Sequence, residues 1–163
     1  MSRVIVAHPL TADAFAPYGD VLDVAGAADK IINAGLCGRY HDRAKLNFTD
    51  GRAGISLFDA TPRALPYTLD LLERHPDGSQ CFVPMHSKAW LVTVAPDDGG
   101  VPGMPVAFIV GAGQAVNLYR GTWHGVLTPL AAPGLFAVID RIGPGANLEE
   151  YALADPYIVT ADA

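Results

Sequence analysis

The sequence contains few cysteines, few basic residues and no long apolar segment. Its 163 residues include two cysteines, and 11 Lys and Arg residues stand against 17 Asp and Glu residues, for a net charge of -6. Proteins that bind nucleic acids neutralise phosphates with clustered Lys and Arg side chains, and this sequence has no such cluster. No segment approaches the roughly 18 consecutive apolar residues of a membrane-spanning helix. We therefore expect neither a nucleic-acid partner nor a membrane partner.

The cysteines and the N-terminal segment bear on the cellular compartment. Cys37 and Cys81 do not have the spacing of a metal-binding or redox motif. The N-terminal sequence MSRVIVAHP has an apolar run of four residues before His8, which is too short for the apolar region of a secretory signal peptide. The sequence predicts a cytoplasmic protein with two free thiols.

Glycine and proline are plentiful, and they divide the chain into short segments. The 17 glycines and 13 prolines bound β-branched or aromatic runs that recur about every ten residues, which is typical of an antiparallel sandwich or barrel. We predict one domain over residues 1–163. The expected strands are 54–60, 67–75, 89–96, 105–111 and 134–143. We also expect a short helix between Thr11 and Pro17, a second helical turn over 149–154, and a surface loop over 95–105.

The first segment with candidate chemistry is YTLDLLERHPDGSQCFVP, residues 67–84. Alternate residues of a strand share a face, so Leu69, Leu71, Glu73 and His75 are expected to point the same way. The sequence PDG then predicts a turn, after which Gln80 begins a returning strand. This pattern predicts a strand that ends in a polar cavity, with the Gln80 amide opposite Glu73 and His75.

The second segment is GQAVNLYRGTWHGVL, residues 113–127. A glycine turn at Gly121 is followed by His124, which is expected to begin another strand with Val126 and Thr128 on the same face. Together the two segments have the spacing Glu-x-His-x4-Gln and Gly-x5-Tyr-x-Gly-x2-His.

These two motifs resemble those of the cupin superfamily, which are His-x-His-x(3–4)-Glu and Gly-x5-Pro-x-Gly-x2-His. The second motif matches closely, with Tyr119 at the usual proline position. The first matches in spacing only, with Glu73, His75 and Gln80 at the positions of the two histidines and the glutamate. The resemblance implies an all-β cupin barrel, a double-stranded β-helix with a few short helices. It also implies that Glu73, His75, Gln80 and His124 meet inside the barrel and bind a divalent metal.

Four separated segments narrow the resemblance to the ureidoglycolate lyase family. They occur in the order INAGLCGRYHDRA, ERHPDGSQCFVP, NLYRGTWHGVL and DRIGPGANLEEY, and the similarity covers nearly the whole chain. The resemblance implies a carbon–nitrogen lyase that cleaves (S)-ureidoglycolate to glyoxylate and urea in allantoin degradation, a part of purine metabolism. It further implies a cytoplasmic homodimer and nickel as the metal.

The residue types suit this chemistry. Breaking the C–N bond of ureidoglycolate needs a base for the hydroxyl proton and an acid for the departing nitrogen, and Glu73, His75 and His124 are the catalytic candidates. Either Glu73 or His124 removes the proton. Either Arg120 or Lys88 holds the substrate carboxylate.

Other polar residues are candidates for contacts with the substrate or between subunits. Asn117, Tyr119 and Gln80 offer hydrogen bonds to the urea group. Asp140 and Arg141 are expected to form an ion pair or a subunit contact.

Two alternatives stay open on the residues alone. Glu73, His75, Gln80 and His124 either hold a divalent ion or bind the substrate directly. The function is either the lyase, another metal-dependent cupin enzyme such as an isomerase or dioxygenase, or a non-catalytic cupin that binds a small acid.

Overall fold

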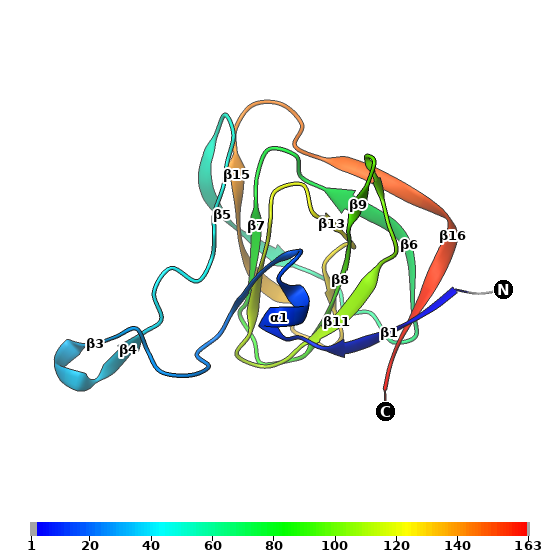
Figure 1. The fold of residues 1–163 in the computed structure, drawn as a ribbon. Coiled ribbons are helices and arrows are strands. Elements are labelled where there is room, and N and C mark those ends of the chain that lie inside the picture. Colours follow the sequence, from blue (N-terminus) through cyan, green and yellow to red (C-terminus); the bar gives the residue numbers. More distant parts are fainter. Residues whose placement is uncertain (1–2, 163) are drawn as a thin grey trace.

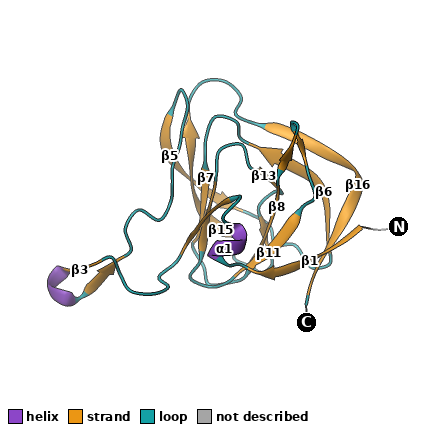
Figure 2. Ribbon diagram, in the orientation of Figure 1, coloured by secondary structure: helices purple, strands orange, loops and turns teal. Residues whose placement is uncertain are grey.

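The computed structural model describes residues 3–162, which form two facing β-sheets (Figures 1 and 2). The strands of the larger, seven-stranded sheet are, in spatial order, β11 (Val106–Val110), β1 (Arg3–Pro9), β16 (Glu149–Ala161), β6 (Tyr67–Arg74), β13 (Trp123–His124), β8 (Trp90–Ala95) and β14 (Thr128–Pro129). Strand β1 pairs parallel with β11 and β16, whereas the other neighbours in this sheet are antiparallel. An additional pairing of β11 with β8 closes the larger sheet into a ring.

The smaller sheet is antiparallel and five-stranded. Its strands are, in spatial order, β2 (Gly19–Leu22), β12 (Ala115–Leu118), β7 (Gln80–Pro84), β15 (Leu135–Ile142) and β5 (Arg52–Asp59). Two hairpins lie outside the sheets, β3 (Lys30–Ile32) with β4 (Cys37–Arg39) and β9 (Asp97–Asp98) with β10 (Val101–Pro102). The short helices are α1 (Ala12–Phe15) and the 3-10 helix η1 (Asn33–Gly35). Among residues 3–162, no helix has both the length and the apolar character of a membrane span.

Two apolar cores lie on opposite faces of β8. Trp90, Val92 and Val94 point toward the smaller sheet and belong to the core between the sheets. Leu91 and Ala95 alternate to the other face and belong to the core inside the ring that the larger sheet closes. Every residue of β8 is buried, because a strand with a core on each face has no side exposed to solvent.

The architecture confirms the predicted all-β cupin fold. Each of the five predicted segments contains a strand, namely β5, β6, β8, β11 and β15. Helix α1 also begins as expected, because the Thr11 side chain accepts a hydrogen bond from the Ala14 N–H at 3.2 Å.

Three local expectations differ from the structure in whole or in part. Residues 149–154 do not form a helical turn, because Glu149–Ala152 pair with Leu71–Arg74 as the start of β16. The predicted loop over 95–105 contains the β9–β10 hairpin. His124 does not begin a long strand either, since β13 ends at His124 and pairing resumes only at β14.

Alternation in β6 also differs from the expectation. Leu69 and Leu72, three residues apart, both belong to the core inside the ring, whereas Leu71 is only half-buried. The register of β16 shifts opposite this point, between Ala152 and Tyr157, and such an irregularity changes which residues of a strand share a face.

Candidate active site

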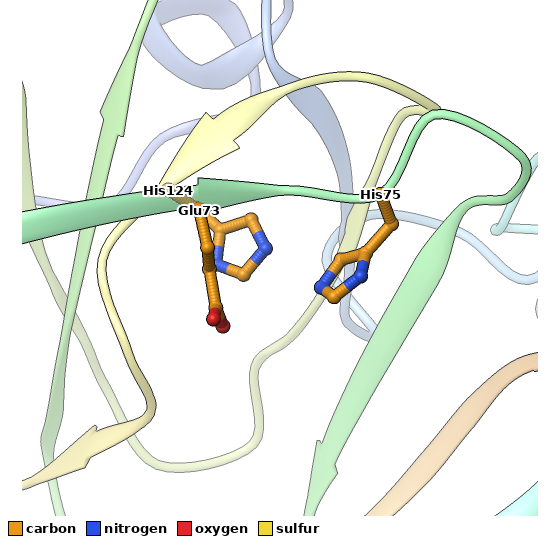
Figure 3. Close-up of side chains that lie close together, drawn as sticks. All are labelled: Glu73, His75 and His124. Atoms are coloured by element: carbon orange, nitrogen blue, oxygen red, sulfur yellow. The ribbon is translucent and has the colours of Figure 1, made fainter. Parts of the chain in front are cut away.

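The end of β6 and strand β13 bring three titratable side chains together. Glu73 is the penultimate residue of β6, His75 follows that strand, and His124 pairs directly opposite Glu73. One ligand atom from each of the three side chains lies within 4.8 Å of the other two. Figure 3 shows the three side chains extending toward a common space. The structure thus places side by side the three residues that the sequence predicted to be catalytic.

In both histidines the backbone contact is made by Nδ1, which leaves Nε2 free of protein partners in the part of the chain that the structure describes. The His75 Nδ1 atom lies 2.7 Å from the backbone oxygen of Asn147, and the His124 Nδ1 atom lies 2.8 Å from that of Gly125. A carbonyl oxygen only accepts hydrogen bonds, so each Nδ1 carries a proton and donates it. Neither Nε2 atom, although buried, has a hydrogen-bond partner among the described residues.

Gln80 is oriented in the same manner. Its Nε2 atom donates to the Asp140 carboxylate at 3.2 Å. Because a carboxylate accepts hydrogen bonds, this contact directs the amide oxygen of Gln80 the other way, and that Oε1 atom is buried without a partner within residues 3–162. Gln80 is two residues before Phe82 on β7 and therefore shares its face toward the space between the sheets. The Phe82 ring lies 6.4 Å from the His124 ring.

Burial controls the charge of the cluster. The pKa of His124 is lowered to about 3, mainly because the ring is completely buried and secondly because the His75 ring is close. The hydrogen bond to the Gly125 backbone acts in the opposite direction and raises the pKa. His124 is therefore neutral at pH 7. Desolvation raises the pKa of Glu73, opposed by His75 and assisted by Glu150. A carboxylate with a raised pKa is a stronger proton acceptor than an exposed one.

The donor set fits a divalent metal ion. It offers one carboxylate and two imidazole nitrogens, with one ligand atom of each residue within 4.8 Å of the other two, and imidazole suits nickel and zinc. The second polar atom of each histidine and of Gln80 is tied to an acceptor, the arrangement that orients metal ligands in proteins. Unpartnered buried acceptors are costly, and a cation is one species that satisfies several of them at once.

Two of the predicted substrate-binding residues lie on the opposite side of the smaller sheet. Asn117 is buried between Val116 and Leu118, which both face the core, so its own side chain faces outward. It donates to Asp20 at 3.1 Å and to the backbone oxygen of Lys45 at 3.2 Å. The hydroxyl of Tyr119 also donates to Asp20, at 2.9 Å. The structure does not bring these two side chains to the cluster.

The two candidate cations lie at different ends of the molecule. Arg120 is exposed and donates to the Thr49 hydroxyl at 2.6 Å. The next residue, Gly121, donates its backbone N–H to the His75 carbonyl at 3.0 Å, so Arg120 belongs to the same rim as the cluster. An open groove of about 510 Å³ beside Arg120 is lined also by Lys45, Leu46, Asn47 and Tyr119. Lys88 is exposed in the turn after β7, at the other end of the strand that begins with Gln80.

Three residues around the cluster have contacts that sequence reasoning missed. Asn147 holds His75 through its backbone oxygen and accepts from the Asp77 N–H through its side chain. Asp140 orients Gln80 and does not pair with Arg141, which instead donates to the backbone oxygens of Thr49, Asp50 and Pro144. The two residues do not form the ion pair that was one of the two expectations, and the other, a subunit contact, stays a prediction. Both Asp140 and Asn147 belong to the quoted segment DRIGPGANLEEY, whose resemblance to a family was the available signal.

Comparison with known proteins identifies the family. A sequence model described as Ureidoglycolate lyase matches residues 2–160. The ureidoglycolate lyase of Rhodobacter capsulatus is 59% identical over 160 residues, which cover 98% of this chain and 99% of that protein. Ureidoglycolate lyase 2 of Rhizobium meliloti is 48% identical over 93% of this chain and 94% of its own. The ureidoglycolate lyase of Chelativorans sp. is likewise 48% identical, over 95% of each chain. The chain belongs to the ureidoglycolate lyase family.

Proposed function

We propose that this protein is a ureidoglycolate lyase, an enzyme that cleaves (S)-ureidoglycolate to glyoxylate and urea. The observation that carries the proposal is the convergence of the Glu73, His75 and His124 side chains in a chain of this family. The reaction is redox-neutral. The hydroxyl O–H and the C–N bond break, a C=O bond forms, and the proton passes from the oxygen to the urea nitrogen.

Glu73 is the proposed base. It has a raised pKa and lies at the edge of the buried cluster, whereas the lowered pKa of the deeply buried His124 makes that imidazole a weak proton acceptor. The carboxylate receives the hydroxyl proton while the C–N electron pair moves onto the urea nitrogen. The same carboxyl group then returns the proton to that nitrogen. One residue that accepts and returns a proton completes the cycle.

His75, His124 and Gln80, together with Glu73, are the residues proposed to hold a divalent ion, with nickel implied by the family resemblance. A bound divalent ion supplies Lewis-acid polarisation of an oxygen of the substrate. Without a bound ion, the proton on each Nδ1 leaves the Nε2 atom of a neutral imidazole as a hydrogen-bond acceptor for the urea N–H groups.

Arg120 is the proposed anchor for the substrate carboxylate. Its backbone neighbour Gly121 donates to the His75 carbonyl, and Arg120 borders an open groove on the side of Tyr119. A planar guanidinium forms two parallel hydrogen bonds with a carboxylate, which fixes the orientation of the substrate. Lys88 is the less suitable of the two candidates because it lies at the far end of β7.

We further propose that the enzyme acts in the cytoplasm as a homodimer, on a small-molecule substrate, in allantoin degradation within purine metabolism. The family membership supports this setting.

Product analysis tests the proposed activity. Racemic ureidoglycolate is incubated with the full chain, with and without a chelator, and glyoxylate, urea and ammonia are quantified. Equal amounts of glyoxylate and urea are expected. Ammonia without urea indicates an amidohydrolase instead, and tight glyoxylate binding without turnover indicates a binding protein. Stoichiometric iron together with oxygen consumption indicates a dioxygenase.

Removing the carboxylate that orients Gln80 is expected to weaken metal binding. In the variant Asp140→Ala the Gln80 amide loses its fixed orientation, and loss of such an outer contact typically costs about 10–100-fold in metal affinity. Calorimetric titration of metal-free protein with nickel chloride measures the effect. The control is Asp59→Ala, which removes an exposed carboxylate at the other end of the β5–β15 pair. Equal nickel affinities of the two variants contradict the proposed role of Gln80.

A further inference from the structure

Residues 24–43 form an arm that projects from the two-sheet body between β2 and Lys45 and carries the β3–β4 hairpin at its end (Figures 1 and 2). The arm has no buried residue. Its apolar side chains are instead largely exposed, with Leu36 89%, Val24 70% and Ile31 61% accessible. A two-stranded hairpin alone is marginally stable in water, so an arm of this kind needs another surface to cover it.

The arm nevertheless has a defined conformation. The Tyr40 hydroxyl donates to the Gly26 carbonyl at 2.8 Å, and the His41 N–H donates to Asp29 at 2.9 Å. Asp29 also forms an ion pair with Arg43 at 2.9 Å. These polar contacts hold the arm in an extended shape before it meets any partner, which reduces the entropy lost on association.

A matching apolar surface lies on the outer face of the smaller sheet. Ile55 and Leu57 of the edge strand β5 point away from the core and are 74% and 64% accessible. They pair in register with Ile139 and Ala137 of β15, which are half-buried. Strand β5 is the opposite edge of this sheet from β2, where the arm begins. Four strand spacings separate these edges by about 19 Å, and the arm projects away from the body, so it does not cover the Ile55 face of its own chain (Figure 1).

We propose that the arm of one copy of this chain packs its Leu36 and Ile31 side chains on the Ile55–Leu57 face of a second copy. The inference rests on the homodimer proposed above and adds the surface through which it forms. A two-fold axis makes the contact reciprocal, so each copy contributes one arm and one sheet face. The twenty residues of the arm and the sheet face together match the roughly 20–30 residues per partner of a stable interface.

Two single substitutions test the contact from its two sides. Leu36→Asp and Ile55→Asp each place a charge where an apolar contact is expected, and each is expected to raise the dimer dissociation constant at least 10-fold. Sedimentation velocity over a dilution series of the full chain measures this, with the wild-type protein sedimenting as a dimer. Both positions are exposed in the single chain, so far-UV circular dichroism of each variant is expected to be unchanged.

The matched control is Met104→Asp. Met104 is 68% exposed and lines a different apolar groove, of about 640 Å³, between β1 and β11. The dissociation constant of this variant is expected to equal that of the wild type. A monomeric wild-type chain, a dimer lost only in Met104→Asp, or a dimer unaffected by Leu36→Asp and Ile55→Asp overturns the proposal.

Cys37, beside Leu36 at the tip of the arm, locates the contact directly. Cys37 is exposed, whereas Cys81 is buried. Burial, and secondly the nearby Asp20 charge, raises the pKa of Cys81 to about 11. A maleimide-linked photo-crosslinker at pH 7 therefore reacts with Cys37. The expected photoproduct joins Cys37 of one copy to a peptide within residues 52–59 of another. A crosslink to any other segment overturns the proposal. Glyoxylate release is measured separately on the same samples, so that a dimer lacking lyase activity contradicts the proposed activity and leaves the interface intact.

Discussion

Replacing Glu73 with glutamine is expected to lower kcat for glyoxylate release by about 10²–10⁴-fold, the usual contribution of one acid–base residue. Glutamine keeps the size of the side chain and removes its ability to accept and return a proton. The substitution therefore separates proton transfer from packing. Steady-state kinetics with (S)-ureidoglycolate measure the loss, and the metal content of both proteins is determined on the same preparations.

The control for this substitution is Asp70→Asn. It makes the same carboxylate-to-amide change on the same strand, at an exposed position outside the cluster. Its kcat is expected to match that of the wild type. Wild-type turnover by Glu73→Gln contradicts the assignment of Glu73 as the base. If turnover falls only in proportion to lost metal, Glu73 acts as a metal ligand and not as the base.

Replacing Phe136 with alanine is expected to lower the free energy of unfolding by about 3–5 kcal/mol, the typical cost of removing a buried aromatic ring. Phe136 is fully buried in the core between the sheets, where its ring lies 5.0 Å from that of Trp90 and 4.9 Å from that of His86. Trp90 belongs to β8 of the other sheet, and His86 lies in the loop after β7. The cavity left by the ring therefore closes only if several segments of the chain move together. Urea unfolding followed by tryptophan fluorescence measures the change.

The comparison for Phe136→Ala is Val101→Ala in the β9–β10 hairpin. Val101 is 40% exposed, and substitutions at such surface positions usually change stability by less than about 0.5 kcal/mol. Equal unfolding midpoints for the two variants contradict the assignment of Phe136 to a tightly packed core.

Local sequence signals predicted the elements that depend on nearby residues. The β-branched run that forms β8 is bounded by proline, and Thr11 caps α1 through its own side chain. Residues 149–154 are a segment in which local signals gave the wrong secondary structure. Their acidic and alanine-rich composition favours a helix, but pairing with β6 recruits them into β16 because the backbone groups of β6 need partners on that side.

Some residues of the candidate site were also predictable from local sequence patterns, and others were not. Glu73 and His75 are two residues apart at the end of β6, and His124 was located by its motif, so the cluster was predictable. Asn117, Tyr119 and Lys88 were selected by residue type within the same segments, and type does not reveal on which side or at which end of a sheet a side chain lies. Asn147 contacts His75 across about 70 residues of sequence, and Asp140 contacts Gln80 across about 60. Patterns of neighbouring residues do not predict contacts at such separations.

The sequence by itself determined the all-β class, about half of the strands of the two sheets and the identity of the three clustered side chains, because periodicity and turn chemistry act over a few residues. Only the tertiary structure decided which nitrogen of each histidine faces the site and which way the Gln80 amide points. It also decided that residues 24–43 leave the body as an exposed arm. These properties are set by hydrogen-bond partners and neighbouring strands that are distant in sequence, and they exist only once the two sheets have packed together.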